Sequence, residues 1–419
     1  MSNFRRVGDL VQSHTKGITP TYVPISNVMV LNQKCIRNNK IDYSFAQYTD
    51  DTKQIPKHKI VCKGDILINS TGQGTAGRCA FVNKLPIGVT LITDSHILLL
   101  RCNSYYEAQC LSYNLYFFEN EIQSFMDGST GQGELDKVRL FNIQVPIPLD
   151  SQTQKQVAIT LYKIDSQIEL NNCINTELES MAKTIFDYWF VQFDFPDKNG
   201  KPYKTSGGKM VQSEELNRSI PEGWEVKYLS EITDISTESL NPINTPHKEF
   251  KHYSIPAFDE SGTYKIEKGQ EIKSSKFTVK DTDLLVSKLN PRFSRVIYST
   301  DDDDLICSTE FVVWRTEDIA SKNYMYMIAR DASFVTYCSQ SASGTSNSHK
   351  RVNPTVMMKY KIVYNNKIAK IFGSTLGSTI RMYAKNQIEN NILSELRNWL
   401  LPMLMNERVN VGTLKNHSK

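Results

Sequence analysis

The sequence predicts an α+β chain made of two similar mixed α/β domains, each followed by a long helix. Three observations lead to this fold class: a length of 419 residues, a repeat that divides the chain into halves, and a heptad pattern after the first half. A chain of this length is expected to form two or three domains. With 40% apolar and 22% charged residues, the composition is that of a globular protein and excludes disordered and collagen-like classes.

The internal repeat is visible in four pairs of segments. The pairs are 64–70 with 282–287, 93–101 with 308–315, 131–137 with 344–350, and 145–148 with 360–363. Because the offset stays near 215 residues, the period is half the chain, which indicates a duplicated domain. The front part of each half carries short apolar runs separated by Gly, Pro, Asn and Asp, which predicts strands and turns.

A long helix is expected at the end of each half, at about 151–192 and 366–408. The first has a seam that steps alternately by four and three residues through Val157, Leu161, Ile164, Ile168, Asn171, Asn175, Leu178, Ala182, Ile185 and Trp189. This is the a/d spacing of a coiled coil, and an amphipathic core helix is the alternative. Amides in mid-seam would fix the register. The second helix is less regular, and Pro402 is expected to bend or end it.

Charge and composition narrow the class of protein further. Lys and Arg number 49 against 45 Asp and Glu, a net charge of +4, so polybasic nucleic-acid binding is not expected, although local basic patches remain open. No apolar run is long enough to span a bilayer, the first residues lack a secretory signal, and the eight cysteines lack paired spacing. We therefore expect a cytoplasmic protein with free thiols.

Several motifs come close to those of enzymes without completing one. Gly72–Cys79 has the glycine spacing of a phosphate loop but lacks its Lys and its Ser/Thr. Asn290-Pro291-Arg292-Phe293 resembles the Asn-Pro-Pro-Tyr/Phe loop of amino-methyltransferases, but Arg replaces the second Pro and no glycine-rich cofactor loop accompanies it, so a turn is expected there. The seven histidines show no metal-binding spacing. The sequence predicts no catalysis, no cofactor and no metal.

A polar pentapeptide, Ser-Thr-Gly-Gln-Gly, occurs twice in the first half, at 70–74 and 129–133. Glycine lets a backbone approach another surface closely, hydroxyls suit phosphates, and glutamine can pair with adenine in the major groove. Basic residues flank both loops and the matching positions of the second half, which predicts DNA binding; tight turns with solvated charges are the alternative. The candidate DNA-binding residues are Ser70, Thr71, Gln73, Arg78, Ser129, Thr130, Gln132, Lys137, Arg139, Lys288, Asn290, Arg292, Arg295, Asn347, Lys350 and Arg351.

The order of these motifs resembles the specificity subunit of type I restriction-modification systems over essentially the whole chain. The matching segments are 64–67, 128–133, 145–148 leading to Gln154, 178–181 through 187–191, 220–224 and 396–402. The resemblance implies two target-recognition domains that each read one half of a bipartite site in double-stranded DNA. Two long antiparallel coiled-coil helices would separate these domains, giving a pseudo-two-fold internal repeat. The helices would dock two modification (methyltransferase) subunits, restriction subunits would join that core, and methylation and ATP-driven cleavage would belong to these partners.

The resemblance divides the chain into six parts. They are recognition domain 1 at 1–150, a spacer helix at 151–192, a linker at 193–217, recognition domain 2 at 218–365, a second spacer helix at 366–408 and a tail at 409–419. The second domain departs from the first because its loop lacks Gly-Gln-Gly and it carries the acidic run Asp301–Asp304. A coiled-coil scaffold with two protein-binding heads is the alternative function, and the two differ because DNA binding weakens steeply with salt.

Overall fold

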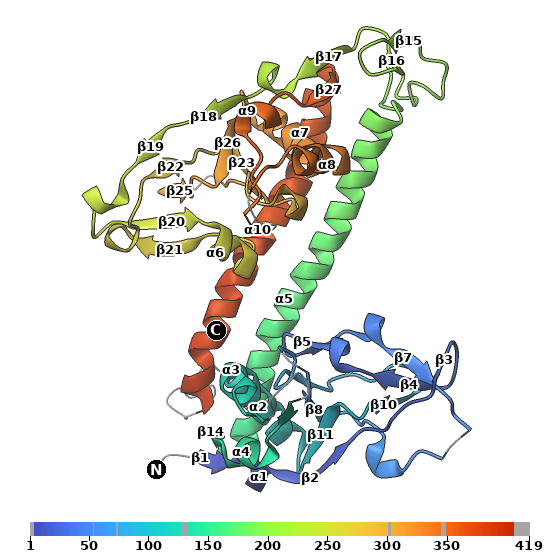
Figure 1. Ribbon diagram of the computed structural model, residues 1–419, viewed down its shortest axis with the longest axis vertical. Helices are drawn as coiled ribbons and strands as arrows, with labels where there is room; N and C mark the ends of the chain where they lie inside the picture. The colour runs from blue at the N-terminus through green and yellow to red at the C-terminus, as the bar shows by residue number, and fades with distance from the viewer. Residues whose placement is uncertain are drawn as a thin grey trace, which may run out of the picture. The chain divides into compact units, whose positions relative to one another are not determined.

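The chain forms two compact units, whose elements are labelled in Figure 1. The computed structural model describes residues 4–52, 54–72, 74–127, 133–300, 303–344 and 349–405. Met1–Ser166 with Ser394–Lys419 make the first unit, and Gln167–Leu393 make the second. Two long helices, α5 (Ser151–Phe186) and α10 (Asn366–Met405), contribute residues to both units. Among the described residues, no helix combines the length and the apolarity that crossing a bilayer requires.

The centre of the first unit is a four-stranded antiparallel sheet. In spatial order its strands are β2 (Val11–Lys16), β11 (Ile97–Cys102), β8 (Ile66–Asn69) and β9 (Cys79–Phe81). Successive side chains of a strand point to opposite faces. Leu98 and Leu100 of β11 pack into a core that includes helical residues, whereas Ile97 and Leu99 pack into a core on the other face. Both faces are therefore covered, which explains why residues 66–68 of β8 and 97–100 of β11 are apolar without alternation.

A second sheet of the same unit supplies the residues of the other core. In spatial order its strands are β10 (Thr90–Thr93), β4 (Val28–Leu31), β7 (Gln47–Thr49) and β3 (Tyr22–Val23), and β10 and β4 run parallel. The shorter elements of the unit are β1 (Phe4–Arg6), α1 (Val7–Leu10), η1 (Gln33–Cys35), β5 (Ile36–Arg37), β6 (Lys40–Ile41), α3 (Glu119–Gln123), β12 (Met126–Asp127), β13 (Glu134–Leu135), α4 (Lys137–Asn142) and β14 (Gln144–Pro146).

Helices close the first core of this unit. Helix α2 (Tyr105–Phe117) begins after Ser104, whose hydroxyl accepts a hydrogen bond from the Glu107 amide at 3.2 Å. The first turns of α5 and the last turns of α10 complete the core with Val157, Leu161, Leu401 and Leu404. Helix α10 continues through Pro402 to Met405, so of the two expected effects of Pro402, a bend or an end, the structure excludes the end. Burial of Leu401 and Leu404, on either side of the proline, explains why the last turn stays helical.

The second unit repeats the central sheet of the first, which confirms the internal repeat. In spatial order the strands are β18 (Asp234–Ser236), β26 (Phe311–Arg315), β23 (Asp283–Ser287) and β24 (Val296–Tyr298), again all antiparallel. The pair β17 (Glu225–Tyr228) and β27 (Lys361–Tyr364) repeats the pair β1 and β14. Helix α7 (Ile319–Arg330) follows β26 as α2 follows β11.

The outer parts of the two units differ more. In place of the four-stranded outer sheet, the second unit has five strands, with the parallel pair β20 and β25 in the place of β4 and β10. The remaining elements of this unit are β15 (Met210–Ser213), β16 (Arg218–Pro221), β19 (Ser239–Leu240), β20 (Glu249–Tyr253), α6 (Ile255–Ser261), β21 (Lys265–Lys268), β22 (Lys276–Thr278), η8 (Pro291–Phe293), β25 (Leu305–Cys307), α8 (Ala332–Gln340) and α9 (Pro354–Met357).

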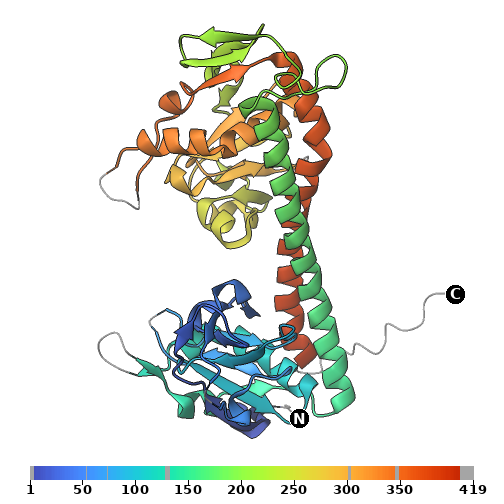
Figure 2. The ribbon, with the colours of Figure 1, turned by 90° about the vertical axis from the view of Figure 1, so that its right-hand side faces the viewer.

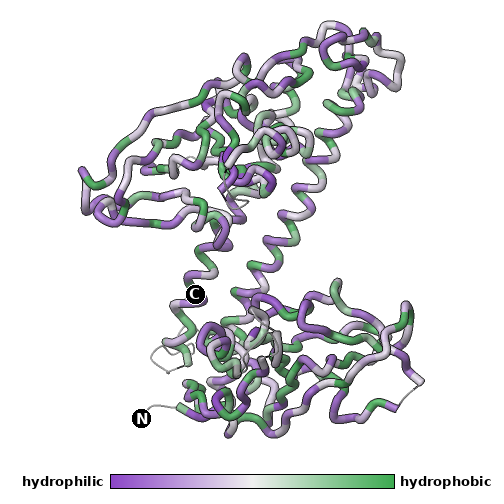
Figure 3. The backbone as a smooth tube through the Cα atoms, in the orientation of Figure 1, coloured by the Kyte–Doolittle hydropathy of each residue, from purple (hydrophilic) through white to green (hydrophobic). Residues whose placement is uncertain are grey.

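Within the second unit, α5 and α10 lie side by side and antiparallel (Figure 2). Hydrophilic and hydrophobic stretches alternate along both helices (Figure 3), and every residue of the predicted α5 seam is buried or half-buried. Asn171 Nδ2 donates to Asn390 Oδ1 at 3.0 Å, and Asn386 Nδ2 donates to Asn175 Oδ1 at 2.9 Å. These buried amides bind one another at the helix interface, as expected for side chains that fix a register.

Candidate nucleic-acid interface

In the first unit, the segment after β8 meets the segment that follows the second pentapeptide. Thr71 forms an antiparallel bridge with Glu134, and the Leu135 amide donates to the carbonyl oxygen of Ser70 at 2.8 Å. The structure therefore places the start of the first pentapeptide next to the residue that follows the second one. Thr71 and Glu134 lie 63 positions apart in the sequence. Of the predicted site residues here, Gln73, Ser129, Thr130 and Gln132 lie outside the described residues.

The two hydroxyl residues of this loop hold its shape. Ser70 is fully buried and its hydroxyl donates to the His96 carbonyl at 2.9 Å. Thr71 is half-buried; Gln33 Nε2 donates to its carbonyl oxygen and to its hydroxyl, each at 2.6 Å, and the hydroxyl lies 2.8 Å from His96 Nδ1. At Gly72, φ is +91° and a Cβ would lie 2.5 Å from Thr75 Oγ1, so this turn requires glycine.

Basic side chains surround this loop. Lys137 begins α4, whose first amides donate to the Asp136 carboxylate, and the side chain of Arg139 is 55% exposed and 3.4 Å from that carboxylate. Lys16 pairs with Glu134 and is the largest cause of the lowered pKa of that carboxyl. Arg78 is half-buried; burial raises the pKa of the Glu119 carboxyl, and the charge of Arg78 opposes that rise.

The second unit builds the same junction from the matching segments. Leu289, which follows β23, forms an antiparallel bridge with Arg351, and the Asn290 amide donates to the Lys350 carbonyl at 2.8 Å. The Val352 amide donates to the carbonyl of Lys288 at 3.0 Å. In both units, then, the loop after the third strand of the central sheet meets the segment after the next helical region. Asn347 lies outside the described residues.

The turn at η8 presents an exposed aromatic ring between two guanidinium groups. Phe293 is 54% exposed, and the guanidinium carbons of Arg292 and Arg295 lie 4.7 Å and 4.8 Å from the centre of its ring. Asn290 and Ser294, at the two ends of the turn, both have φ of +46°, a backbone region that non-glycine residues rarely adopt. Such strain concentrates at functional sites. The predicted turn is confirmed, and its conformation favours a contact role.

Carboxylates hold two of the basic side chains in this unit. Both Arg295 and Arg351 form two hydrogen bonds to one carboxylate, Arg295 to Asp259 at 2.6 and 2.8 Å and Arg351 to Glu310 at 2.9 and 3.1 Å. Within the described part of the chain, no carboxylate lies within 4.0 Å of the other three predicted basic residues, Lys288, Arg292 and Lys350. Of the predicted basic residues in this unit, these three are therefore the ones without a carboxylate partner among the described residues.

Sequence reasoning missed three members of this interface. Gln33 and His96, which position Thr71, lie 38 and 25 residues from it in the sequence, and no local pattern connects them. Phe293 lies in an Arg-Phe-Ser-Arg stretch, where an aromatic residue between two arginines could have been recognised as a stacking element.

Comparison with known proteins agrees with this arrangement. Residues 2–180 match the family described as "Type I restriction modification DNA specificity domain". The chain is 23% identical to the type I restriction enzyme HindI specificity subunit of Haemophilus influenzae, over 91% of this chain and 94% of that protein. It is 25% identical to the MjaIX specificity subunit of Methanocaldococcus jannaschii, over 70% of this chain and 68% of that protein.

A solved structure shares the fold of the chain. The crystal structure of the type I restriction-modification S subunit from M. genitalium superposes with a TM-score of 0.59 at 14% identity, over 96% of this chain and 95% of that one. Family, relatives and fold agree with one another and with the duplicated architecture. Over most of its length, the chain is similar to specificity subunits of type I restriction-modification systems.

Proposed function

We propose that this chain selects the DNA sequence on which a type I restriction-modification complex acts, with each unit reading one half of a bipartite target. One observation carries the proposal: both units place a basic polar loop at the same junction, marked by the bridges Thr71 to Glu134 and Leu289 to Arg351. Two similar loops with different side chains suit two different half-sites.

Contacts in such an interface fall into two classes. Arg292, Lys350 and Lys137 would neutralise phosphates, which supplies affinity without sequence preference. Glutamine and asparagine side chains, Gln73 and Gln132 in the first unit and Asn347 in the second, would contact base edges in the major groove. Ser70 and Thr71 would act through loop shape, because their hydroxyls are already bound within the protein.

The division of labour follows from the same proposal. Recognition domains at 1–150 and 218–365 would bind DNA, and the helices at 151–192 and 366–408 would dock two modification subunits. Restriction subunits would join through that core, and the chain would perform no catalysis of its own, acting in the cytoplasm without a cofactor. Methylation and cleavage would then belong to the partners.

Methylation mapping tests the proposal directly. The full chain is co-expressed with the neighbouring modification subunit, and methylated adenines are mapped across the host genome, with the modification subunit alone as the control. We expect a split motif with an undefined central spacer that disappears in the control. A continuous motif, or methylation that persists without this chain, would contradict the proposal.

A further inference from the structure

The second unit contains an open groove of about 730 Å³ that the DNA-contact loops do not use. Its walls come from the C-terminal end of α5, the β15–β16 hairpin, α7, the start of α8 and β27. Aromatic rings dominate these walls, among them Phe186, Phe190, Tyr324, Tyr337 and Tyr360. A concave, largely apolar site of this volume is of the size that binds ligands or peptide segments.

One wall residue has an unused hydrogen-bonding group. Tyr324 is 1% exposed, and its hydroxyl is buried with no hydrogen-bond partner among the described residues. A buried hydroxyl without a hydrogen-bond partner destabilises a protein, and a bound acceptor would remove this cost. Burial also raises the pKa of Tyr324 well above its usual value, which keeps the group a donor.

The rim of the groove is basic. Arg218 and Lys359 are exposed, and no carboxylate of the described residues lies within 4.0 Å of either. The third cation of the lining, Lys361, pairs with Glu215 at 3.3 Å. The one acidic lining residue, Asp331, accepts a hydrogen bond from the Ser333 amide at 2.9 Å and so caps α8. The uncompensated charge is therefore positive and complements an acidic partner.

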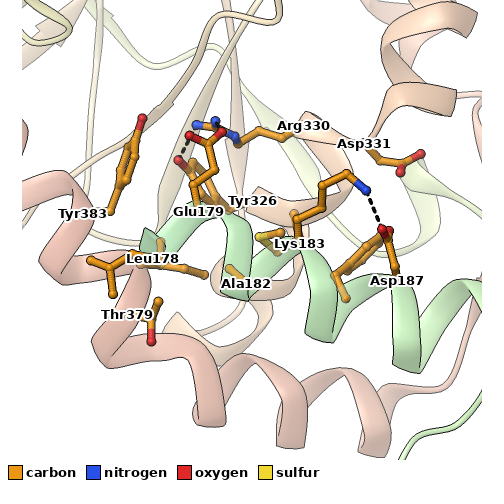
Figure 4. A pocket seen from close by; sticks show the side chains of 13 residues that line it. Leu178, Glu179, Ala182, Lys183, Asp187, Tyr326, Arg330, Asp331, Thr379 and Tyr383 are labelled. Carbon is orange, nitrogen blue, oxygen red and sulfur yellow. Dashed lines mark hydrogen bonds and ion pairs between the residues drawn. The ribbon is translucent and has the colours of Figure 1, made fainter. Parts of the chain in front are cut away.

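A smaller pocket of about 80 Å³ is shown in Figure 4. Its lining shares Phe186 and Asp331 with that of the groove. Its apolar lining includes Ala182, Met327 and Ile380. The charged groups at its mouth form two ion pairs, Arg330 with Glu179 and Lys183 with Asp187, which Figure 4 shows as dashed contacts. Because these charges already have partners, the pocket suits an uncharged apolar side chain.

We propose that the groove and the pocket together hold an acidic amphipathic segment of one modification subunit, with an apolar side chain anchored in the pocket. This rests on the proposed function, which supplies the partner. Apolar walls favour a protein segment over DNA, whose backbone would meet only Arg218 and Lys359 at the rim. All residues that line the groove and the pocket belong to the second unit.

The test uses the full chain and the neighbouring modification subunit, with the stoichiometry of the complex measured by native mass spectrometry. Wild type is expected to bind two modification subunits. The charge-reversed variant Arg218→Glu/Lys359→Glu is expected to bind one, and Thr379→Phe, which fills the pocket from α10, is expected to do the same. The matched control Lys201→Glu/Lys204→Glu changes two exposed lysines of the segment 193–217, neither of which lines the groove, and this variant should still bind two modification subunits.

The outcomes separate this inference from the proposed function. If wild type binds no modification subunit, the proposed function fails. If wild type binds two and both variants also bind two, the groove is not the docking site and the inference is wrong. Loss of both subunits, or loss of DNA binding with both subunits retained, would also overturn it. A melting temperature equal to that of wild type shows that a variant is folded. If the double variant Arg218→Glu/Lys359→Glu is unfolded, Thr379→Phe alone tests the inference.

Discussion

Arg315 holds the carboxylate of Asp283 with two hydrogen bonds of 2.8 Å each. Arg101 holds Asp65 in the first unit in the same way, at 2.9 and 3.1 Å. Asp283 is 0% and Asp65 3% exposed. Each pair joins two neighbouring strands of a central sheet, at the end away from the loop that we propose contacts DNA. The duplicated domain has therefore kept a buried ion pair as well as its strand order.

Loss of either carboxylate should destabilise its unit strongly. Asp65→Asn leaves Arg101 with no carboxylate within 4.0 Å among the described residues, and Asp283→Asn leaves Arg315 with only the exposed Glu238. We expect each variant to lower the unfolding free energy by about 3 kcal/mol. Urea denaturation measures this. The control is Asp304→Asn, which removes an exposed pair with Lys248 and should change stability by less than about 1 kcal/mol. Equal effects at Asp283 and Asp304 would mean that burial does not decide the value of these pairs.

Phosphate contacts should be visible in the salt dependence of DNA binding. We expect Lys137→Ala and Arg292→Ala each to weaken binding to all sequences and to reduce the slope of log K against log salt by about one. Fluorescence anisotropy over a salt series measures the slope. Lys280→Ala serves as the control because this lysine pairs with Glu238 at 2.9 Å, at the start of β23 rather than at its loop end. An unchanged slope would remove the substituted residue from the phosphate contacts.

Base reading should depend on single amides. Gln132→Ala is expected to relax specificity at one base pair of one half-site by roughly 1–3 kcal/mol. Competition binding with single-base variants of the target measures this, and the other half-site is the internal control. Should affinity fall equally for every variant of the target, Gln132 would be a backbone-contact or folding residue.

The amides between α5 and α10 should be energetically coupled. Asn175→Ala and Asn386→Ala break the same 2.9 Å hydrogen bond, so a double-mutant cycle should show about 1 kcal/mol of coupling. The exposed Thr176, whose hydroxyl bonds only within its own helix, gives the control cycle with Asn386, which should be additive. Additivity in the first cycle would mean that solvent replaces the bond without loss.

A buried lysine should make stability depend on pH. Lys322 is 0% exposed; its ammonium group donates to Ser299 O at 2.6 Å and lies 3.8 Å from the centre of the Tyr298 ring. Burial lowers the pKa of Lys322 to about 7 from an ordinary 10.5, although Asp281 opposes the shift. Between these two values the unfolded chain binds a proton that the folded chain has released, so raising the pH favours the folded state.

The measurement for Lys322 is the unfolding free energy of wild type and of Lys322→Met from pH 7 to pH 10.5. We expect the stability of wild type to rise with pH relative to that of the variant, because methionine does not titrate. A constant difference across this range would show that the folded lysine keeps an ordinary pKa.

Local periodicity was enough to predict much of the fold. The seam from Val157 to Trp189 could be predicted directly because each of its residues lies three or four positions, about one helical turn, after the one before it. The duplicated sheets could be expected because β8 and β23 have similar sequences. The second helix was expected to reach about residue 408, but the sequence could not show what keeps it helical past Pro402, because burial of Leu401 and Leu404 depends on residues more than 200 positions earlier in the chain.

The contact loops were only partly predictable for the same reason. Two identical pentapeptides suggested a shared role, but the bridge from Thr71 to Glu134 depends on how the sheets fold. The ion pairs of Arg295 with Asp259 and of Arg351 with Glu310 join segments 36 and 41 residues apart. The sequence therefore could not distinguish these two arginines from Arg292, which pairs with no carboxylate of the described residues.

The first unit is built from two segments that lie far apart in the chain, and this has a consequence for protein synthesis. Its core needs Leu401 and Leu404 from a segment that begins at Ser394, and the ribosome makes that segment 228 residues after Ser166, the difference between positions 394 and 166. At about 5–20 residues per second, the nascent chain would wait roughly 10–45 s with Val157 and Leu161 uncovered. The domain translated first would therefore be completed last, and a chaperone has that interval in which to protect it.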